Sequence, residues 1–267
     1  MRVRIHLELV KHVGPKPYLP FEYQYYLTAL VYRLLAQSST DYATYLHDRG
    51  YESGEKQFRL FTFSQLEIRK RKVTSRGIEF LGAEASWQVS SPVRDFVKYL
   101  ADGLLDQETI QVGQLTFAVT GAEIVSPPSF ASPMRFICLS PITVSRAAPE
   151  LGRPAYYLRY QDPEFSHRLR ENLLRKYLAL SPDLPEDTSF EFAFDNGYIE
   201  RHQGKISRLV TYRDQRILGY MAPFSLSGNP ELIRFAYECG LGEKNSFGFG
   251  MIAAGHSADG NSSVSCP

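Results

Sequence analysis

The first fifty residues show two periods of hydrophobic and polar positions. In residues 1–10, MRVRIHLELV, the aliphatic side chains Val3, Ile5 and Leu7 alternate with polar ones. Because neighbouring side chains of a strand point to opposite faces, this predicts a strand with one buried face. Residues 20–37 carry apolar side chains at helical spacing. Residues 39–50 predict a short second helix, with Ser39 or Thr40 as its N-cap and Gly50 just past its end.

The remaining pattern up to residue 126 completes a known order of elements. Strands are expected over residues 56–70 and 78–91, a helix over 91–105 and a long strand over 110–126. Together with the first strand and helix, the order is β-α-β-β-α-β. This order is typical of a ferredoxin-like domain.

The second half repeats this order after a Pro- and Ser-rich linker, SPPSFASP, at residues 126–133. Strands are expected over 134–146, 188–202, 204–227 and 247–253, and helices over 162–180 and 229–240. The sequence therefore predicts an α+β protein of two tandem ferredoxin-like (RRM-like) βαββαβ domains, residues 1–126 and 127–254. The small, polar residues 255–267 are expected to form a disordered tail.

The composition indicates a globular protein but does not identify a ligand. The chain has 267 residues, 43% of them hydrophobic, which is ample for packed cores. Its net charge of +1 means that any nucleic-acid binding must rest on local clusters of Lys and Arg. Three widely spaced cysteines, no signal-like start and no apolar run of transmembrane length indicate a cytoplasmic protein without membrane contact. No spacing of Asp, Glu, His or Cys indicates a metal site or a cofactor.

A glycine cluster, GLGEKNSFGFG, occupies residues 240–250. It is not a Walker A loop, because Lys244 is followed by Asn245 rather than Ser or Thr. It is not a dinucleotide fingerprint either, because it leads from a predicted helix into a predicted strand. Two interpretations remain: a helix cap at Gly240 followed by a flexible loop, or an anion-binding concavity to which Lys244 adds charge.

The spacing of this cluster carries a family resemblance. The pattern GxGxxxxxGFG with a central Lys resembles the C-terminal glycine-rich loop of CRISPR-associated repeat-cleaving endoribonucleases, the sixth Cas family of the repeat-associated RNA-binding superfamily. YLHDRGY at 45–51 and FRLFTFS at 58–64 are similar to the N-terminal region of that family. The resemblance implies a metal-independent, cofactor-free RNase in which a ribose 2′-hydroxyl attacks the adjacent phosphate, leaving a 2′,3′-cyclic phosphate and a 5′-hydroxyl.

Such a reaction needs groups that move protons and a positive charge near the phosphorane. Of the six histidines, His47 is the best placed, at the end of the short helix, although a His at such a position is usually only a surface residue. The resemblance adds an upstream tyrosine, for which Tyr32 has a suitable distance, and a downstream lysine, Lys56. Arg49 or Arg59 could substitute for the lysine.

RNA-binding residues are expected in three places. In the glycine cluster they are Gly240, Gly242, Lys244, Asn245, Ser246, Gly248 and Gly250. Arg208, Arg213 and Arg216 are interleaved with Tyr212 and Tyr220, a mixture that suits phosphate contact and base stacking. Arg69 and Arg71 belong to a basic run that is equally explained as a solvated hairpin. The basic residues of the helix over 162–180, including Arg175 and Lys176, are best interpreted as an ordinary exposed face.

The partners follow from the resemblance. CRISPR repeat RNA, as precursor and as product, is the expected ligand, and other CRISPR effector proteins and a second copy of the chain are left open. A non-catalytic subunit that holds CRISPR RNA in an effector complex would share the fold and the glycine loop. A general tandem-RRM protein is disfavoured, since no central strand carries an RNP1-type segment.

Overall fold

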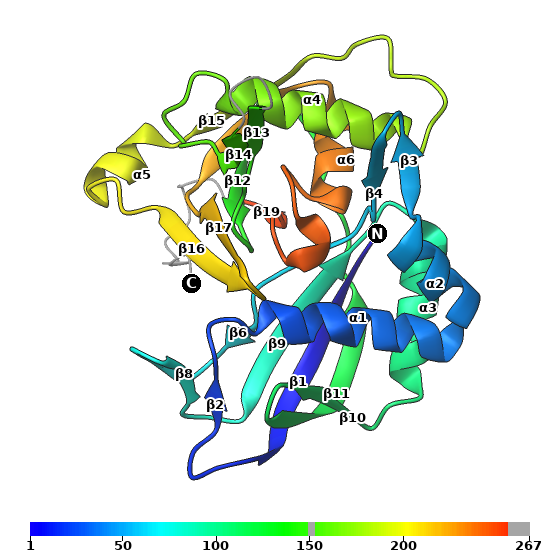
Figure 1. Cartoon of the computed structure of the whole chain (residues 1–267), viewed down its shortest axis with the longest axis vertical. Helices are drawn as coiled ribbons and strands as arrows, with labels where there is room; N and C mark the ends of the chain where they lie inside the picture. Colours follow the sequence, from blue (N-terminus) through cyan, green and yellow to red (C-terminus); the bar gives the residue numbers. More distant parts are fainter. Residues whose placement is uncertain (149–152, 256–267) are drawn as a thin grey trace.

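The computed structural model describes residues 1–148 and 153–255 and places the first half of the chain on one antiparallel sheet (Figure 1). Its strands run in the order β10-β11-β1-β9-β5, with β6 also paired to β9. Strand β1 (Arg2–His12) therefore lies between β11 (Leu115–Ile124) and β9 (Glu84–Ser90). The short strands β5 (Thr62–Phe63) and β6 (Glu67–Ile68) form one edge and β10 (Thr109–Val112) the other.

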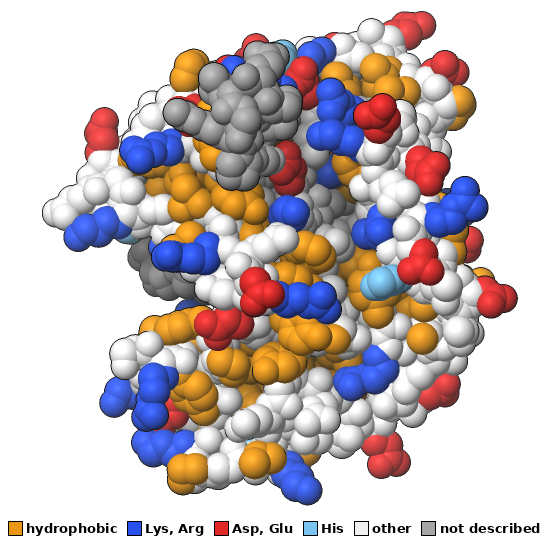
Figure 2. All heavy atoms as spheres, in the orientation of Figure 1, with side chains coloured by type: hydrophobic (Ala, Val, Ile, Leu, Met, Phe, Trp, Pro, Cys, Tyr) orange, Lys and Arg blue, Asp and Glu red, His pale blue; other side chains and the backbone are white. Residues whose placement is uncertain are grey.

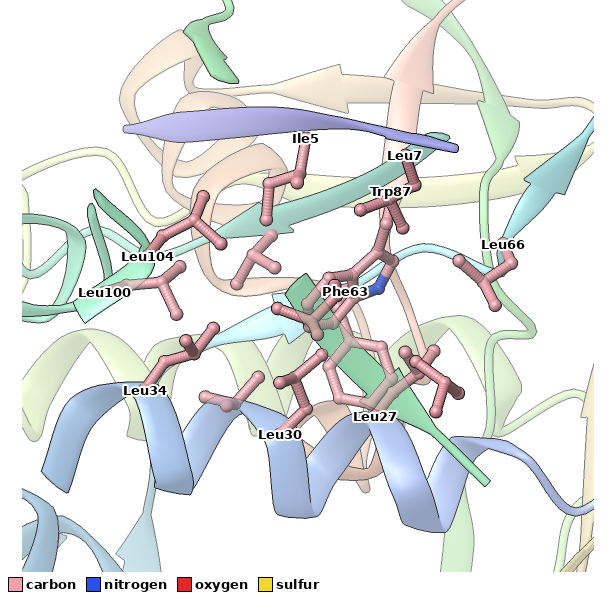
Figure 3. Close-up of a cluster of buried hydrophobic side chains, with 14 of the residues drawn as sticks. Ile5, Leu7, Leu27, Leu30, Leu34, Phe63, Leu66, Trp87, Leu100 and Leu104 are labelled. Carbon is pink, nitrogen blue, oxygen red and sulfur yellow. The ribbon is translucent and has the colours of Figure 1, made fainter. Parts of the chain in front are cut away.

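Helices cover one face of this sheet. The apolar stripe of each helix packs against the buried side chains that alternate along the strands. Leu27, Leu30 and Leu34 of α1 (Gln24–Ser38) pack against Ile5 and the other buried side chains of the sheet (Figure 3). Helix α3 (Arg94–Leu105) lies beside α1. The short helix α2 (Thr40–Asp48) begins at Ser39, whose Oγ accepts a hydrogen bond from the Tyr42 N–H at 3.3 Å. Of the two N-caps predicted from the sequence, Ser39 is therefore the one the protein uses.

The second half repeats the arrangement on a four-stranded sheet of order β15-β18-β12-β19. The strands are β12 (Met134–Cys138), β15 (Phe190–Phe194), β18 (Phe224–Gly228) and β19 (Ile252–Ala254), and the helices are α4 (Phe165–Leu178) and α6 (Pro230–Cys239). Both sheets thus have the strand order of a βαββαβ unit, and the predicted α+β fold of two tandem ferredoxin-like units is confirmed. The domain boundary at 126/127 stays a prediction, and the predicted tail lies outside the described residues from residue 256 on.

Several expected long strands were wrong because the chain turns within them. Residues 110–126 form the hairpin β10–β11, which turns at Gly113 (φ +61°). Residues 188–202 form β15 followed by α5 (Asn196–Arg201), because Asp195 caps that helix by accepting the Tyr198 N–H. Residues 204–227 form the hairpin of β16 (Ser207–Tyr212) and β17 (Gln215–Tyr220) before β18.

Further short strands divide the remaining segments. Residues 56–70 are split into β4 (Lys56–Phe58), which pairs with β3 (Tyr51–Ser53), and then β5 and β6. Strands β7 (Arg71–Thr74) and β8 (Gly77–Phe80) form a hairpin, to which β2 (Tyr18–Leu19) adds a strand. Strands β13 (Ser145–Ala148) and β14 (Arg153–Tyr157) pair with each other. None of the described helices has both the length and the apolar character needed to cross a membrane.

Buried polar contacts join the two units. The Arg2 guanidinium of β1 is 2% exposed and donates from Nη2 to the carbonyls of Tyr237 (3.0 Å) and Ile252 (2.7 Å) of the second unit. It also lies 3.7 Å from the centre of the Tyr237 ring. Thr62 Oγ1 of β5 donates to the Phe249 carbonyl at 2.9 Å. These contacts fix the second unit against the first.

Candidate functional site

A groove of about 920 Å3 runs between the two units. Its walls come from α1, the end of α2 and the segment 56–61 on one side, and from α4 and the glycine cluster on the other. The face drawn in Figure 2 is hollowed between the upper and lower parts of the molecule, and Lys and Arg side chains stand around the hollow. The three predicted catalytic residues, His47, Tyr32 and Lys56, all line this groove, as do Lys244 and Arg213.

His47 and Tyr32 form a pair on the wall of the first unit. Their ring centres are 5.4 Å apart in an edge-to-face arrangement. The imidazole is 68% exposed, and its Nδ1 lies 2.8 Å from Oδ1 of Asp48. Since an ionised carboxylate only accepts hydrogen bonds, this contact makes Nδ1 the protonated nitrogen of neutral His47 and leaves the Nε2 lone pair open.

Tyr32 is partly buried behind His47, with its ring against Phe61. Burial raises the pKa of the Tyr32 hydroxyl, and the nearby Arg59 guanidinium opposes that shift. At neutral pH the hydroxyl therefore keeps its proton and acts as a donor. Sequence position alone did not distinguish Tyr32 from the other tyrosines of α1, and the structure places it beside His47.

Two cations stand on the same wall. Lys56 at the start of β4 is exposed, and Arg59 is half-buried. The Arg59 guanidinium donates to the carbonyls of His47 (2.6 Å) and Arg49 (3.1 Å), so it caps the end of α2 and holds the His47 backbone in place. Arg59 thus has a structural task at the site besides the charge it contributes.

The glycine cluster forms a compact loop that closes on itself. Asn245 is buried, and its Nδ2 donates to the carbonyls of Leu241 and Phe249, each at 3.0 Å. Lys244 has a left-handed backbone, φ +58°, and its Nζ lies 5.7 Å from the centre of the Phe247 ring. The Ser246 carbonyl accepts from Thr28 Oγ1 of α1 at 3.1 Å. Asn245 therefore braces the loop from inside, and Lys244 and Ser246 line the groove.

The glycines of this loop lie where an added side chain would clash, and a substitution can measure the cost of that clash. Gly250 has φ +75°, and a Cβ there would overlap the Leu241 carbonyl oxygen and lie 2.6 Å from Asn245 Nδ2. We expect Gly250→Ala to lower the free energy of unfolding by about 3 kcal/mol, as the sum of left-handed strain and overlap. Urea unfolding measures this loss.

The matched control for that variant is Gly54→Ala. Gly54 also has positive φ, +59°, but a Cβ there would meet nothing within 4 Å. The Gly54→Ala variant should lose only the free energy that left-handed strain costs, about 1 kcal/mol. Equal losses in the two variants would show that the loop is not sterically closed.

The β16–β17 hairpin reaches the groove with its turn. Tyr212 stacks on Phe247 of the loop, with ring centres 4.2 Å apart, and the Arg213 guanidinium lies 4.9 Å from the centre of the Tyr25 ring of α1. Arg213 lines the groove, whereas Arg208 and Arg216 are exposed on the hairpin away from its lining. Of the three arginines predicted to bind RNA together, one therefore lies in the groove and two lie outside its lining.

The predicted basic run at 67–77 lies elsewhere. Arg69 forms an ion pair with Glu84 at 2.5 Å, and Arg71 starts β7 of the solvated hairpin β7–β8. Neither residue belongs to the groove lining. Their part in RNA binding stays a prediction. Within residues 1–148 and 153–255, no three His, Cys, Asp or Glu side chains gather into a group that could hold a metal ion.

Comparison with known proteins identifies the family. The family model described as CRISPR-associated protein Cas6, N-terminal, matches residues 18–123, and that described as CRISPR associated protein Cas6, C-terminal, matches residues 125–254. The chain belongs to the Cas6 family. The resemblance seen in the glycine cluster and in the segment around His47 is thereby confirmed.

Relatives of this Cas6 chain match it over nearly its whole length. It is 32% identical over 253 residues to CRISPR-associated endoribonuclease Cas6 1 of Methanocaldococcus jannaschii, covering 94% of this chain and 93% of that one. It is 29% identical over 252 residues to a putative CRISPR-associated endoribonuclease-like protein Cas6 of Pyrococcus furiosus, covering 94% and 98%. A solved structure described as an RAMP protein binding different RNA substrates has a TM-score of 0.80 at 26% identity, covering 96% of this chain and all of that one.

Some residues of the Cas6 groove gave little signal in the sequence. Thr28 lies in the buried stripe of α1 and Tyr25 is partly buried near its start, and in the sequence both suggest only packing. Lys176, expected on an exposed face, lies instead on the floor of the groove. A lysine at the spacing of buried Leu169 and Leu173 was the available clue.

Proposed function

We propose that the chain is an endoribonuclease that cleaves CRISPR repeat RNA in precursor transcripts to give guide RNAs. The observation that carries this is the meeting of His47, Tyr32 and Lys56 in one groove with Lys244 of the glycine loop. A proton-transferring pair on one wall and a phosphate-attracting loop on the other suit RNA lying between them. Cas6 membership and the relatives named as endoribonucleases support the same activity.

The proposed first step is attack of a ribose 2′-hydroxyl on the adjacent phosphorus. His47 accepts the 2′-hydroxyl proton at Nε2, while its Nδ1–H is held by Asp48. The new bond joins the 2′-oxygen to phosphorus, and the bond from phosphorus to the 5′-oxygen breaks. The products are a 2′,3′-cyclic phosphate and a 5′-hydroxyl, whose oxygen takes up a proton as it leaves.

Tyr32, Lys56 and Arg59 complete this proposal on the same wall. Tyr32 keeps its proton at neutral pH, since burial raises its pKa, so it can donate to a phosphate oxygen or to the leaving 5′-oxygen. Lys56 and Arg59 place positive charge beside the phosphorane, whose oxygens gain negative charge. These residues supply the base, the donor and the charge, so the proposed reaction needs neither a metal nor a cofactor.

The test uses a panel of CRISPR repeat RNAs in excess chelator. We expect cleavage to persist with chelator, to leave a 2′,3′-cyclic phosphate end, and to stop when the nucleotide before the cut carries a 2′-deoxy sugar. The deoxy RNA should still bind, which a filter-binding assay checks. Tight binding of unmodified RNA without any cut would instead assign the chain to the non-catalytic subunits of an effector complex.

Beyond repeat RNA, other CRISPR effector proteins, a second copy of the chain and a cytoplasmic location stay predictions from the sequence. The RNA-binding roles of the remaining residues also stay predictions. Those residues are the four loop glycines, Asn245, Arg208 and Arg216.

A further inference from the structure

Lys176 is a buried cation at a position where the helix pattern calls for an apolar residue. The buried side chains of α4 are Phe165, Leu169, Leu173 and Lys176, which follow one another along a single face. Lys176 is 3% exposed, and burial lowers the pKa of its ammonium group. Burying a lysine among apolar neighbours costs free energy unless its protons are bound. Its place therefore calls for specific partners.

Those partners are backbone carbonyls of the glycine loop. Lys176 Nζ donates to the carbonyl oxygens of Gly240 at 2.9 Å and of Gly242 at 2.6 Å. The two carbonyls flank Leu241, which is fully buried. Both glycines have positive φ, +84° and +69°, so this arm has little backbone preference of its own for the shape it adopts. The ammonium group therefore holds the carbonyl side of these two peptide groups, whose N–H sides donate to the carbonyls of Gly250 (2.8 Å) and Thr143 (2.9 Å).

The rest of the loop is held by other residues. Asn245 ties Leu241 to Phe249 inside the loop, and Thr28 of α1 holds the Ser246 carbonyl. From α4, on the far wall of the groove, Lys176 supplies the hydrogen bonds to the loop, and Leu169 packs beside Gly242. The loop is thus fastened from both walls, and the two carbonyls that turn toward Lys176 are kept away from the negative RNA backbone.

We propose that Lys176 is a positioning residue that fixes residues 240–242 from beneath, so that Lys244 and Ser246 face RNA in the groove. The part of this proposal that concerns RNA rests on the proposed function. The part that concerns the shape of the loop does not. The hydrogen-bond partners of Lys176 are neutral carbonyls, so they leave the charge of its ammonium form unpaired. The carboxylate that raises the pKa of Lys176, Glu243, accepts a hydrogen bond from Ser145 Oγ at 2.7 Å.

The test is Lys176→Met, which keeps the length of the side chain and continues the apolar stripe. We expect a folded protein in which amide hydrogen exchange over residues 240–247 is at least about tenfold faster without RNA. We expect the Kd for repeat RNA to rise by about tenfold or more, while the cleavage rate of bound RNA changes by less than about threefold. The Kd should change without the cleavage rate because His47, Tyr32 and Lys56 stay in place.

The matched control is Arg175→Met, one residue earlier on α4. Arg175 is exposed, so this variant removes the same charge without touching the loop, and Kd should change by less than about threefold. A second variant, Lys176→Arg, keeps a charged donor and should recover much of the exchange protection. It also serves if the methionine variant does not fold.

Two outcomes would overturn the proposal. One is unchanged exchange over 240–247 in the folded methionine variant, and the other is equal loss of affinity in the Arg175 control. If the wild-type protein bound no repeat RNA, the proposed function would fail instead. The exchange measurement would then still decide the role of Lys176.

Discussion

Replacing His47 by alanine should slow cleavage of bound repeat RNA by a factor of about 10² to 10⁴. The variant removes the one imidazole that lines the groove among the described residues, and with it the nitrogen that we assign as the base. RNA affinity should change little, because His47 is 68% exposed and the loop is held by other residues. Single-turnover cleavage with protein in excess separates the rate from the affinity.

The control for this variant is His167→Ala. His167 lies on α4, is similarly exposed (63%), and sits 3.9 Å from Glu171 as an ordinary surface pair. It should cleave at the wild-type rate. If the His47 variant cleaved as fast as the His167 variant, the assignment of His47 as the base would be wrong, and cleavage would have to depend on other groups of the groove.

Replacing Arg2 by alanine should lower the free energy of unfolding by about 2–4 kcal/mol. The change leaves the Tyr237 and Ile252 carbonyls without their buried donor and opens a cavity against the Tyr237 ring. Burial lowers the pKa of Arg2 to about 10, so the guanidinium is still charged at neutral pH and its two hydrogen bonds are charge-assisted. Urea unfolding followed by tryptophan fluorescence gives the measurement.

Arg4→Ala is the matched control on the same strand. Arg4 is partly exposed and pairs with Glu123 at the surface, at 3.3 Å. Such a pair contributes less than about 1 kcal/mol. A loss in the Arg2 variant no larger than in the Arg4 variant would contradict the view that Arg2 joins the two units.

The sequence predicted the order of elements well where periodicity and a stop signal coincided. The alternation of β1 and the stripe of α1 both appear in the structure, and α6 ends before Gly240 as expected. The prediction missed several turns, and one of them carries no glycine. Strands β16 and β17 meet at Arg213, a non-glycine residue with φ +53°, inside a segment whose alternation continues on both sides. In the structure the Tyr212 and Arg213 side chains at this turn contact Phe247 and Tyr25.

The candidate site was predictable in part, and for a physical reason. His47, Tyr32 and Lys56 were found through a family resemblance carried by short local segments, and the structure places them in one groove. Lys176 could not be found in that way, since the carbonyls it binds are 64 and 66 residues further along the chain. A lysine on an amphipathic helix is usually solvated, and only the fold shows which one is not.

Helix α1 contacts both the glycine loop and the proposed catalytic histidine. Thr28 holds the glycine loop through the Ser246 carbonyl, and Tyr32, four residues later, meets His47. Four residues of an α-helix advance about 6 Å, little more than one turn. If the loop grips one backbone phosphate, the site of the cut lies at a spacing set by this turn. The helix would then set the distance between the gripped phosphate and the cut. A residue inserted between Thr28 and Tyr32 would rotate Tyr32 away from the RNA.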